Sequence, residues 1–428
     1  MTGAALGAAL VARGLDPAAG AAKAALFETV IGTFRAAAGT EPALAWWVPG
    51  RLEVFGKHTD YAGGRSLVCA LPNGLAVAAA ARADGAVRVI DATRGDHVLI
   101  APGDRATFSG WRHYVAVAVR RLAANFPGAL LGADIVFGSD LPRASGMSSS
   151  SALVVAVSTA LVRTAGIADR PAWRDNIRST LHIAGYFACI ENGRSFGTLA
   201  GDAGVGTHGG SEDHAAILAG TSGQLSAFAF VPMRPLGRVG MPHDWRFVLA
   251  PSAVRSAKTG SAQGAYNNLA RGAQVLLEMW NAAHPRAESL AAALAAGSEE
   301  EWRTLIRASG VAGWPPDVLE RRLAHFIRED RRVPEALDAV GSGEGARLSA
   351  LADESQADAE ALLGNQVPET IALARAARSL GAFAACSFGA GFGGSVWALV
   401  EGDAAGFAAR WQPGAFVARP APPVTALP

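Results

Sequence analysis

An α+β fold with two lobes is the architecture that this sequence predicts. Short apolar or alternating runs over residues 65–101, 133–142 and 245–253 are typical of strands, whereas residues 263–378 carry a largely helical pattern. The strands therefore cluster early in each half of the chain, unlike the regular strand and helix alternation of a doubly wound sheet. A length of 428 residues is also large for a single core, which favours two packed lobes.

The composition favours a well-buried enzyme. Apolar residues make up 50% of the chain and charged residues 18%, and the formal net charge is +1, so neither nucleic acid nor a membrane is an expected partner. Cys69, Cys189 and Cys386 are widely spaced, which indicates a reducing compartment, and we expect a cytoplasmic protein. The Ala-rich start lacks the pattern of a signal peptide, and residues 20–38 predict an amphipathic helix.

A serine-rich turn, LPRASGMSSSSALVVA at residues 141–156, is the first candidate site. The turn follows a strand and opens a buried helix at Ser150, so several backbone N–H groups and the positive end of the helix dipole face one point. Gly146 permits close backbone approach, and the hydroxyls of residues 148–151 suit phosphate or Mg²⁺. No lysine follows, so this is not the GxxxxGK[ST] loop. An N-capped core helix is the alternative.

Two more stretches suggest chemistry. SFGAGFGGS, residues 387–395, is a turn almost without side chains, which predicts either a tight hairpin or close approach of the backbone to a ligand. PGRLEVFGKHTDYAGG, residues 49–64, is a polar cluster between apolar strands and is suited to hydrogen-bonding a polyol, with a solvated loop as the alternative. Its polar members are Arg51, Lys57, His58, Asp60 and Tyr61.

Together the three motifs resemble those of the GHMP kinase superfamily, and PGRLEVFGKHTDYAGG resembles the sugar signature of its galactokinase branch. LPRASGMSSSSA is similar to the ATP-binding motif of the superfamily and SFGAGFGGS to its third motif, in matching order. The resemblance implies a two-lobed GHMP fold with the active site between the lobes. We expect a helical extension over residues 1–40, an N-terminal domain over 41–235 and a C-terminal domain over 236–428.

The resemblance also implies an enzyme that uses ATP and Mg²⁺ to phosphorylate the anomeric C1 hydroxyl of a sugar. Within GGSEDHAAILAG it assigns Asp213 to the attacking hydroxyl, as base or orienting group, and Arg51 to the charge on Asp213 and on the phosphoryl group. Glu191 is the candidate Mg²⁺ ligand, with Ser149 or Ser150 as its partner.

The remaining expected contacts fall into two sets. The nucleotide is expected along Ala144, Ser145, Gly146, Met147, Ser148, Ser149, Ser150, Ser151, Gly389, Gly391 and Gly393. The sugar is expected against Lys57, His58, Asp60, Tyr61 and Tyr266. The segment GDAGVGTHGG looks like an insertion between Glu191 and Asp213, and Glu212 and His214 stand where the family usually has apolar and amide side chains.

Lys57 is the departure that bears most on the substrate. Galactokinases usually carry a glutamate at this position, which bonds the C6 hydroxyl of the sugar, whereas an ammonium would attract a substrate carboxylate. The sequence therefore leaves galactose and a C6-modified or acidic relative, such as a uronic acid, both open. The alternative is that Lys57 pairs with Asp202, Glu212 or Glu53 and does not touch the sugar. A non-catalytic sugar and ATP sensor, or another small-molecule GHMP kinase, also stays open, and the sequence does not determine the oligomeric state.

Overall fold

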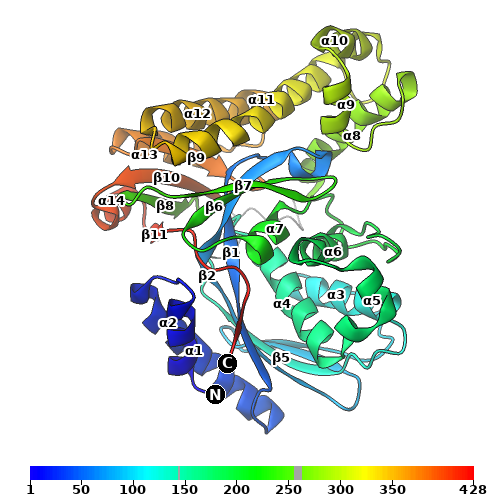
Figure 1. Cartoon of the computed structure of the whole chain (residues 1–428), viewed down its shortest axis with the longest axis vertical. Helices are drawn as coiled ribbons and strands as arrows, with labels where there is room; N and C mark the ends of the chain where they lie inside the picture. The colour runs from blue at the N-terminus through cyan, green and yellow to red at the C-terminus, as the bar shows by residue number, and fades with distance from the viewer. Residues whose placement is uncertain (143–144, 255–262) are drawn as a thin grey trace.

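The computed structural model describes residues 1–142, 145–254 and 263–428 and shows two lobes, each built on a β-sheet with helices against it (Figure 1). The strands are β1 (Leu44–Phe55), β2 (Arg65–Ala81), β3 (Val87–Asp91), β4 (Asp96–Ile100), β5 (Ala133–Ser139), β6 (Gln224–Ala229), β7 (Arg234–Gly240), β8 (Trp245–Pro251), β9 (Ala384–Phe388), β10 (Ser395–Glu401), β11 (Phe416–Ala418) and β12 (Thr425–Leu427).

The helices stand in groups between runs of strands in the first lobe and dominate the second. They are α1 (Gly3–Ala12), α2 (Pro17–Ala38), α3 (Trp111–Asn125), α4 (Ser149–Thr164), α5 (Pro171–Asn176), α6 (Thr180–Asn192), α7 (Glu212–Ala219), α8 (Gln263–Ala283), α9 (Leu290–Ala296), α10 (Glu299–Ala308), α11 (Pro316–Gly341), α12 (Gly345–Asp358), α13 (Pro368–Ser379) and α14 (Ala404–Trp411). Short helical turns are η1 (Asp60–Ala62), η2 (Ile167–Asp169) and η3 (Ala359–Leu363).

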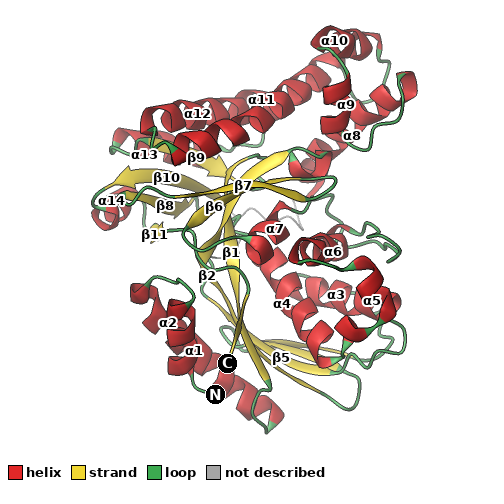
Figure 2. Cartoon of the chain, in the orientation of Figure 1, coloured by secondary structure: helices red, strands yellow, loops and turns green. Residues whose placement is uncertain are grey.

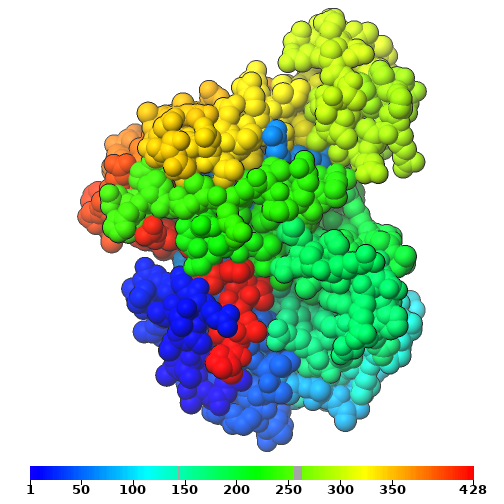
Figure 3. Space-filling model, in the orientation of Figure 1, coloured from blue at the N-terminus to red at the C-terminus, as the bar shows by residue number. Residues whose placement is uncertain are grey.

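The first lobe is organised by a mixed sheet in the order β12-β1-β2-β5-β3-β4, with β6 paired to β2 and β7 to β6. The β3–β5 pair is parallel and the other pairs of this sheet are antiparallel. Leu427 of β12 lies opposite Ala45 of β1, so the last strand of the chain completes the first lobe. Figure 3 shows this C-terminal segment, in red, against the blue N-terminal helices.

Helices cover both faces of this sheet (Figure 2). Successive side chains of a strand point to opposite faces, and the neighbours Trp46 and Trp47 of β1 follow this rule. Trp47 packs in the core formed with α1 and α2, where its ring centroid lies 6.4 Å from that of Phe27. Trp46 belongs to the larger core that α3 and α4 share with the sheet. Since both faces are buried, β1 can place polar side chains in the interior only where they are paired.

The second lobe has an antiparallel sheet in the order β11-β8-β10-β9, packed against α12, α13 and α14. Helices α8 to α11 form a separate core, in which the rings of Trp280 and Trp302 stack with centroids 5.0 Å apart. Tyr61 and Ala62, from the turn after β1, belong to this same core. The second lobe therefore packs directly on the motif expected to bind sugar.

Most expected elements are confirmed, including the helix over residues 20–38 and the strands at 133–142 and 245–253. Strand β2 continues through Pro72. A shift in register beside Gly50 of β1 accommodates the proline there, since a bulge does not need its missing N–H. No helix in the described part of the chain has the length and apolar character needed to cross a membrane.

Candidate active site

A cavity where β1, α7 and the turn after β1 meet the glycine loop collects most of the polar residues singled out in the sequence. Among the side chains that line it are Arg51 of β1, Asp213 of α7 and Tyr266 of α8. His58, Asp60, Tyr61, Glu191 and Gly389 also line it. The fold therefore brings residues that are far apart in the sequence to one wall.

Arg51 and Asp213 form the central ion pair of the cavity. The Arg51 Nε donates to Asp213 Oδ1 at 2.6 Å, and its Nη1 donates to the carbonyl oxygen of Gly146 at 2.8 Å. Arg51 is almost completely buried, but the carboxylates around it more than offset the cost of burial and raise the pKa of the guanidinium. A fixed positive charge therefore lies between the Asp213 carboxylate and the serine turn.

Ser151 connects Asp213 to Glu191. Its hydroxyl lies 2.8 Å from Glu191 Oε2 and 3.1 Å from Asp213 Oδ2. The serine that the structure brings to Glu191 is thus Ser151, whereas Ser149 is exposed and Ser150 half-buried. Ser151 is the third residue of α4 and lies on the buried face of that helix, so its hydroxyl faces inward.

Asp60 holds the start of α7. Its Oδ2 accepts the backbone N–H of Glu212 at 3.0 Å, and its Oδ1 accepts that of Tyr61 at 2.8 Å. The first N–H groups of a helix have no partner within the helix, so this carboxylate caps α7 from outside. A Cβ on Gly210 would come within 2.1 Å of Asp60 Oδ2, which explains the glycine before α7. Asp60 in this way sets the position of Asp213.

Three rings form another part of the wall. His58 Nδ1 lies 2.9 Å from the Tyr61 hydroxyl, and its Nε2 lies 3.1 Å from the carbonyl oxygen of Ala390 in the glycine loop. The ring of Tyr266 lies 5.3 Å from that of His58, between centroids. Burial raises the pKa of Tyr61 to about 12, although the nearby Arg322 opposes the shift. Such rings offer a sugar both an apolar surface and hydrogen-bonding groups.

The serine turn and the glycine loop adjoin each other. Ser395 Oγ donates to the carbonyl oxygen of Ser145 at 2.7 Å, and a Cβ on Gly389 would lie 3.0 Å from the carbonyl oxygen of Gly146. Gly389 has a φ of 78°, which favours glycine. Of the positions expected to bind the nucleotide, Ala144 lies outside the described residues. Met147 is buried, and its carbonyl accepts the Arg51 N–H at 3.3 Å.

Ser148 provides an orphaned polar atom beside this contact. It precedes α4 with a φ of 59°, and its buried hydroxyl has no hydrogen-bond partner among the described residues. A hydroxyl of this kind next to the N-terminus of a helix fits a phosphate oxygen. The turn is therefore compatible with the expected ATP, with Gly391 and Gly393 in the loop opposite at φ values of 75° and 119°.

The donor set also fits Mg²⁺. Carboxylate and hydroxyl oxygens from Glu191, Asp213 and Ser151 converge at hydrogen-bonding distance. No cluster of three or more acidic, histidine or cysteine ligands occurs among the described residues. In phosphoryl-transfer sites Mg²⁺ usually takes one or two protein carboxylates and completes its shell with water and substrate phosphates.

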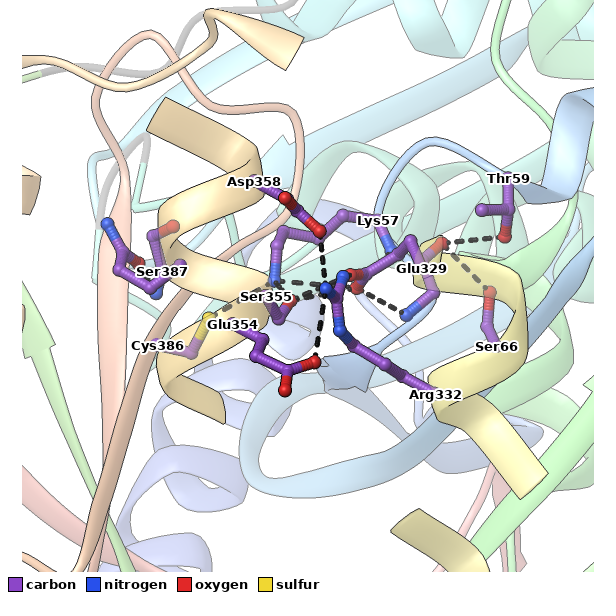
Figure 4. Close-up of polar contacts among 12 residues, drawn as sticks. Lys57, Thr59, Ser66, Glu329, Arg332, Glu354, Ser355, Asp358, Cys386 and Ser387 are labelled. Atoms are coloured by element: carbon purple, nitrogen blue, oxygen red, sulfur yellow. Dashed lines mark hydrogen bonds and ion pairs between the residues drawn. The ribbon is translucent and has the colours of Figure 1, made fainter. Parts of the chain in front are cut away.

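Lys57 does not lie on the cavity wall, although it was expected to contact the sugar. Its side chain is fully buried on the other side of the turn, where Nζ donates to Ser355 Oγ at 2.6 Å and to Cys386 Sγ at 3.2 Å (Figure 4). Glu329 Oε1 lies 3.6 Å from the ammonium, and none of the three partners suggested by the sequence forms the ion pair. Burial disfavours the charge, but Cys386, Glu329 and Glu53 together raise the pKa of Lys57. The groups that bind the Lys57 ammonium are therefore protein side chains behind the cavity wall.

Two carboxyl groups on the wall were not expected as site residues. Glu53, two positions after Arg51 on the same face of β1, and Glu212, the first residue of α7, both line the cavity and are almost fully buried. Glu53 Oε1 has no hydrogen-bond partner among the described residues, and Glu212 Oε2 accepts from Ser66 Oγ at 2.7 Å. Burial, followed by the charges of Glu53 and Asp60, raises the pKa of Glu212 well above its usual range.

Comparison with known proteins agrees with this geometry. Three family models match the chain: the galactokinase galactose-binding signature over residues 32–81, the N-terminal domain of GHMP kinases over 113–186 and the C-terminal domain of GHMP kinases over 335–416. In fold, the chain is similar to a mevalonate kinase of Methanococcus jannaschii, with a TM-score of 0.58, 13% identity and coverage of 89% of this chain and 98% of the other. The protein is a GHMP kinase.

The similar proteins with higher identity specify the branch. Galactokinases of Streptomyces coelicolor and Roseiflexus sp. are 28% and 27% identical to the chain over 394 and 369 residues. These alignments cover 87% and 85% of this chain and 90% and 85% of the relatives. The structure of Lactococcus lactis galactokinase complexed with galactose has a TM-score of 0.74 at 21% identity, over 92% of this chain and 98% of that one. The chain belongs to the GHMP kinases as a galactokinase-like kinase.

Proposed function

We propose that the protein transfers the γ-phosphoryl group of ATP to the anomeric C1 hydroxyl of a neutral hexose of the galactose type. The observation that carries the proposal is the Arg51–Asp213 pair, which lies in the cavity and is joined through Gly146 to the serine turn. Phosphoryl transfer needs a group facing the nucleophile, a fixed positive charge and a phosphate cradle. These three requirements are met by adjacent groups, and the named galactokinase relatives support the sugar class.

In this proposal Asp213 orients the sugar hydroxyl and accepts its proton. Arg51 and Ser151 hold the two oxygens of Asp213 in place, so the carboxylate needs little rearrangement when the hydroxyl attacks. Arg51 also faces the negative charge that develops during transfer. Bound Mg²⁺ would neutralise phosphate charge, with Glu191 as the carboxylate that holds it.

A neutral sugar is favoured over a uronic acid on grounds of charge. The cavity wall carries more carboxylates than cations among its described residues, and Lys57 is engaged by Glu329 behind the wall. A substrate carboxylate would be repelled by such a wall. Apart from Glu212, whose pKa is raised well above its usual range, the acidic residues that line the cavity are Glu53, Asp60, Glu191 and Asp213.

The test is ADP release with a panel of sugars, in which neutral hexoses and uronic acids are compared at equal concentration. Galactose or a neutral relative should be phosphorylated, and Asp213→Asn should lower turnover by roughly 10²-fold or more while the KM for ATP changes little. Asp169→Asn, at an exposed ion pair on the same lobe, is the matched control and should retain wild-type turnover. ATP and sugar binding without ADP release would favour a non-catalytic sensor, and turnover only with a non-sugar alcohol would favour another GHMP kinase.

A further inference from the structure

Helix α11 of the second lobe holds the turn that carries His58, Asp60 and Tyr61. The contact is made by Glu329, which has no exposed surface and does not line the cavity. Its Oε1 accepts the backbone N–H groups of Gly56, at 3.0 Å, and of Lys57, at 3.3 Å. These are the residues at which the chain leaves β1 and enters the turn.

The backbone at Gly56 explains why such support is needed. Gly56 has a φ of 104°, and a Cβ there would come within 2.3 Å of the carbonyl oxygen of Arg65. The chain reverses direction here in a conformation that favours glycine, and the turn as a whole is buried. Buried N–H groups need an acceptor, and Glu329 provides one for both.

A cluster of buried polar groups fixes Glu329 in turn (Figure 4). Arg332 Nη1 donates to Glu329 Oε2 at 3.0 Å, and Ser355 Oγ lies 2.8 Å from the same oxygen. Lys57 contributes its ammonium, 3.6 Å from Oε1. Burial alone would raise the pKa of Glu329, but Lys57, with His325, Arg332 and the Gly56 N–H, lowers it to about 2. The carboxylate is therefore charged and held between two cations.

Helix α11 contacts the same turn at a second point. Arg322 Nη2 donates to the carbonyl oxygen of His58 at 2.7 Å and to the Tyr61 hydroxyl at 3.0 Å. Arg322 precedes Glu329 by seven residues, which is about two helical turns, so both side chains leave the same face of α11. One carboxylate binds the entry to the turn and one guanidinium binds its middle.

From these contacts we infer that Glu329 is a positioning residue for sugar binding, with Lys57 as its counter-ion. Glu329 does not touch the cavity, but it fixes the backbone from which His58, Asp60 and Tyr61 reach the wall. This inference rests on the proposed function for the identity of the ligand. The sugar affinity would then depend on helix α11, although Glu329 is 273 residues from Gly56 in the sequence.

Steady-state kinetics of Glu329→Ala test this role. Loss of the acceptor should raise the KM for sugar by roughly 10-fold or more and leave the KM for ATP within about 2-fold, because the nucleotide contacts lie on other segments. Glu329→Gln keeps an oxygen that can accept the two N–H groups, so it should recover part of the sugar affinity. Asp338→Asn, at an exposed ion pair on the same helix, is the matched control and should change neither KM. Equal changes in both KM values, or an unchanged sugar KM, would overturn the inference.

Ser355→Ala is a milder variant in case Glu329→Ala does not fold. It removes the hydroxyl that binds both Glu329 and Lys57, and should raise the sugar KM by about 3-fold relative to Ser349→Ala, a control on the same helix. An unchanged sugar KM in Ser355→Ala would count against the inference.

Hydrogen exchange separates this inference from the proposed function, because it needs no turnover. Peptides covering residues 56–61 should exchange faster in Glu329→Ala, or in Ser355→Ala, than in the wild type and the controls. Unchanged exchange at these amides would overturn the positioning role even if the sugar is correctly identified. Faster exchange in a protein that phosphorylates no sugar would retain the role of Glu329 and reject the proposed function.

Discussion

Substitution of Lys57 by glutamate is the perturbation for which the structure and the family resemblance make opposite predictions. If position 57 bonded the C6 hydroxyl as it usually does in galactokinases, Lys57→Glu would help a neutral sugar. In the structure the same change removes the ammonium from Ser355, Cys386 and Glu329 and places a carboxylate against Glu329. We therefore expect damage to the fold and no gain in specificity.

The magnitude follows from burial. The side chains of Lys57 and Glu329 are 1% and 0% exposed, so solvent hardly screens their interaction. Removal of one partner from a buried ion pair costs about 3 to 5 kcal/mol, and repulsion between two carboxylates adds to this. Lys57→Glu should thus lower the free energy of unfolding by at least about 4 kcal/mol, and Lys57→Met, which adds no repulsion, by about 3 kcal/mol. Reversal of charge at the exposed pair formed by Arg35 and Glu41 should change the free energy of unfolding little, because solvent screens this pair.

Thermal unfolding followed by sugar kinetics is the assay. The unfolding midpoint should decrease from wild type to Lys57→Met and again to Lys57→Glu, and kcat/KM should fall for every accepted sugar in step. Two results would refute this reasoning. One is a Lys57→Glu protein with the wild-type midpoint. The other is selective loss of activity on a uronic acid with galactose unharmed, which would show that the ammonium reads the substrate.

Three further predictions concern the cavity and the serine turn. Ser148→Ala should raise the KM for ATP several-fold and leave the KM for sugar unchanged, because its hydroxyl, which has no partner among the described residues, lies in the turn expected to hold the phosphates. A nucleotide-bound structure with the triphosphate away from residues 145–151 would contradict this assignment. Tyr266→Phe should raise the KM for sugar, and unchanged Michaelis constants for every sugar would remove its support. Glu212→Gln should raise the unfolding midpoint relative to wild type more at pH 8 than at pH 4. The pKa of Glu212 is higher in the folded protein than in the unfolded chain, so the contribution of this carboxyl to stability is full below its unfolded pKa and is lost as the pH rises through its folded pKa. An equal difference in midpoint between Glu212→Gln and wild type at the two pH values would count against this prediction.

Local patterns in the sequence were enough for the strands and helices expected above and for the backbone motifs. Ser148 and the glycine loop could be recognised because a turn before a helix and a run of glycines have local signatures. The strand β12 was missed because three residues near the C-terminus carry no periodic pattern, and their pairing with β1 depends on the folded lobe.

The partner of Lys57 could not be predicted for a similar reason. The sequence showed that a lysine stood where the family has a carboxylate, but Glu329 is 272 residues away on a helix whose position depends on the other lobe. Glu53 was within reach of sequence reasoning. A second charged residue two positions after Arg51 on a strand buried on both faces must lie beside it, and this alternation was a signal for the cavity wall.

The position at which the sugar is phosphorylated is the most direct test of the proposed reaction. Wild-type protein would be incubated with ATP, Mg²⁺ and galactose, with Asp213→Asn in parallel, and the product examined by ³¹P and ¹H NMR. We expect a hexose phosphate whose phosphorus couples to the anomeric proton, formed by the wild type and roughly 10²-fold more slowly by Asp213→Asn. Phosphorylation at another carbon, undiminished turnover in the variant, or phosphorylation of a uronic acid in preference to galactose would contradict it.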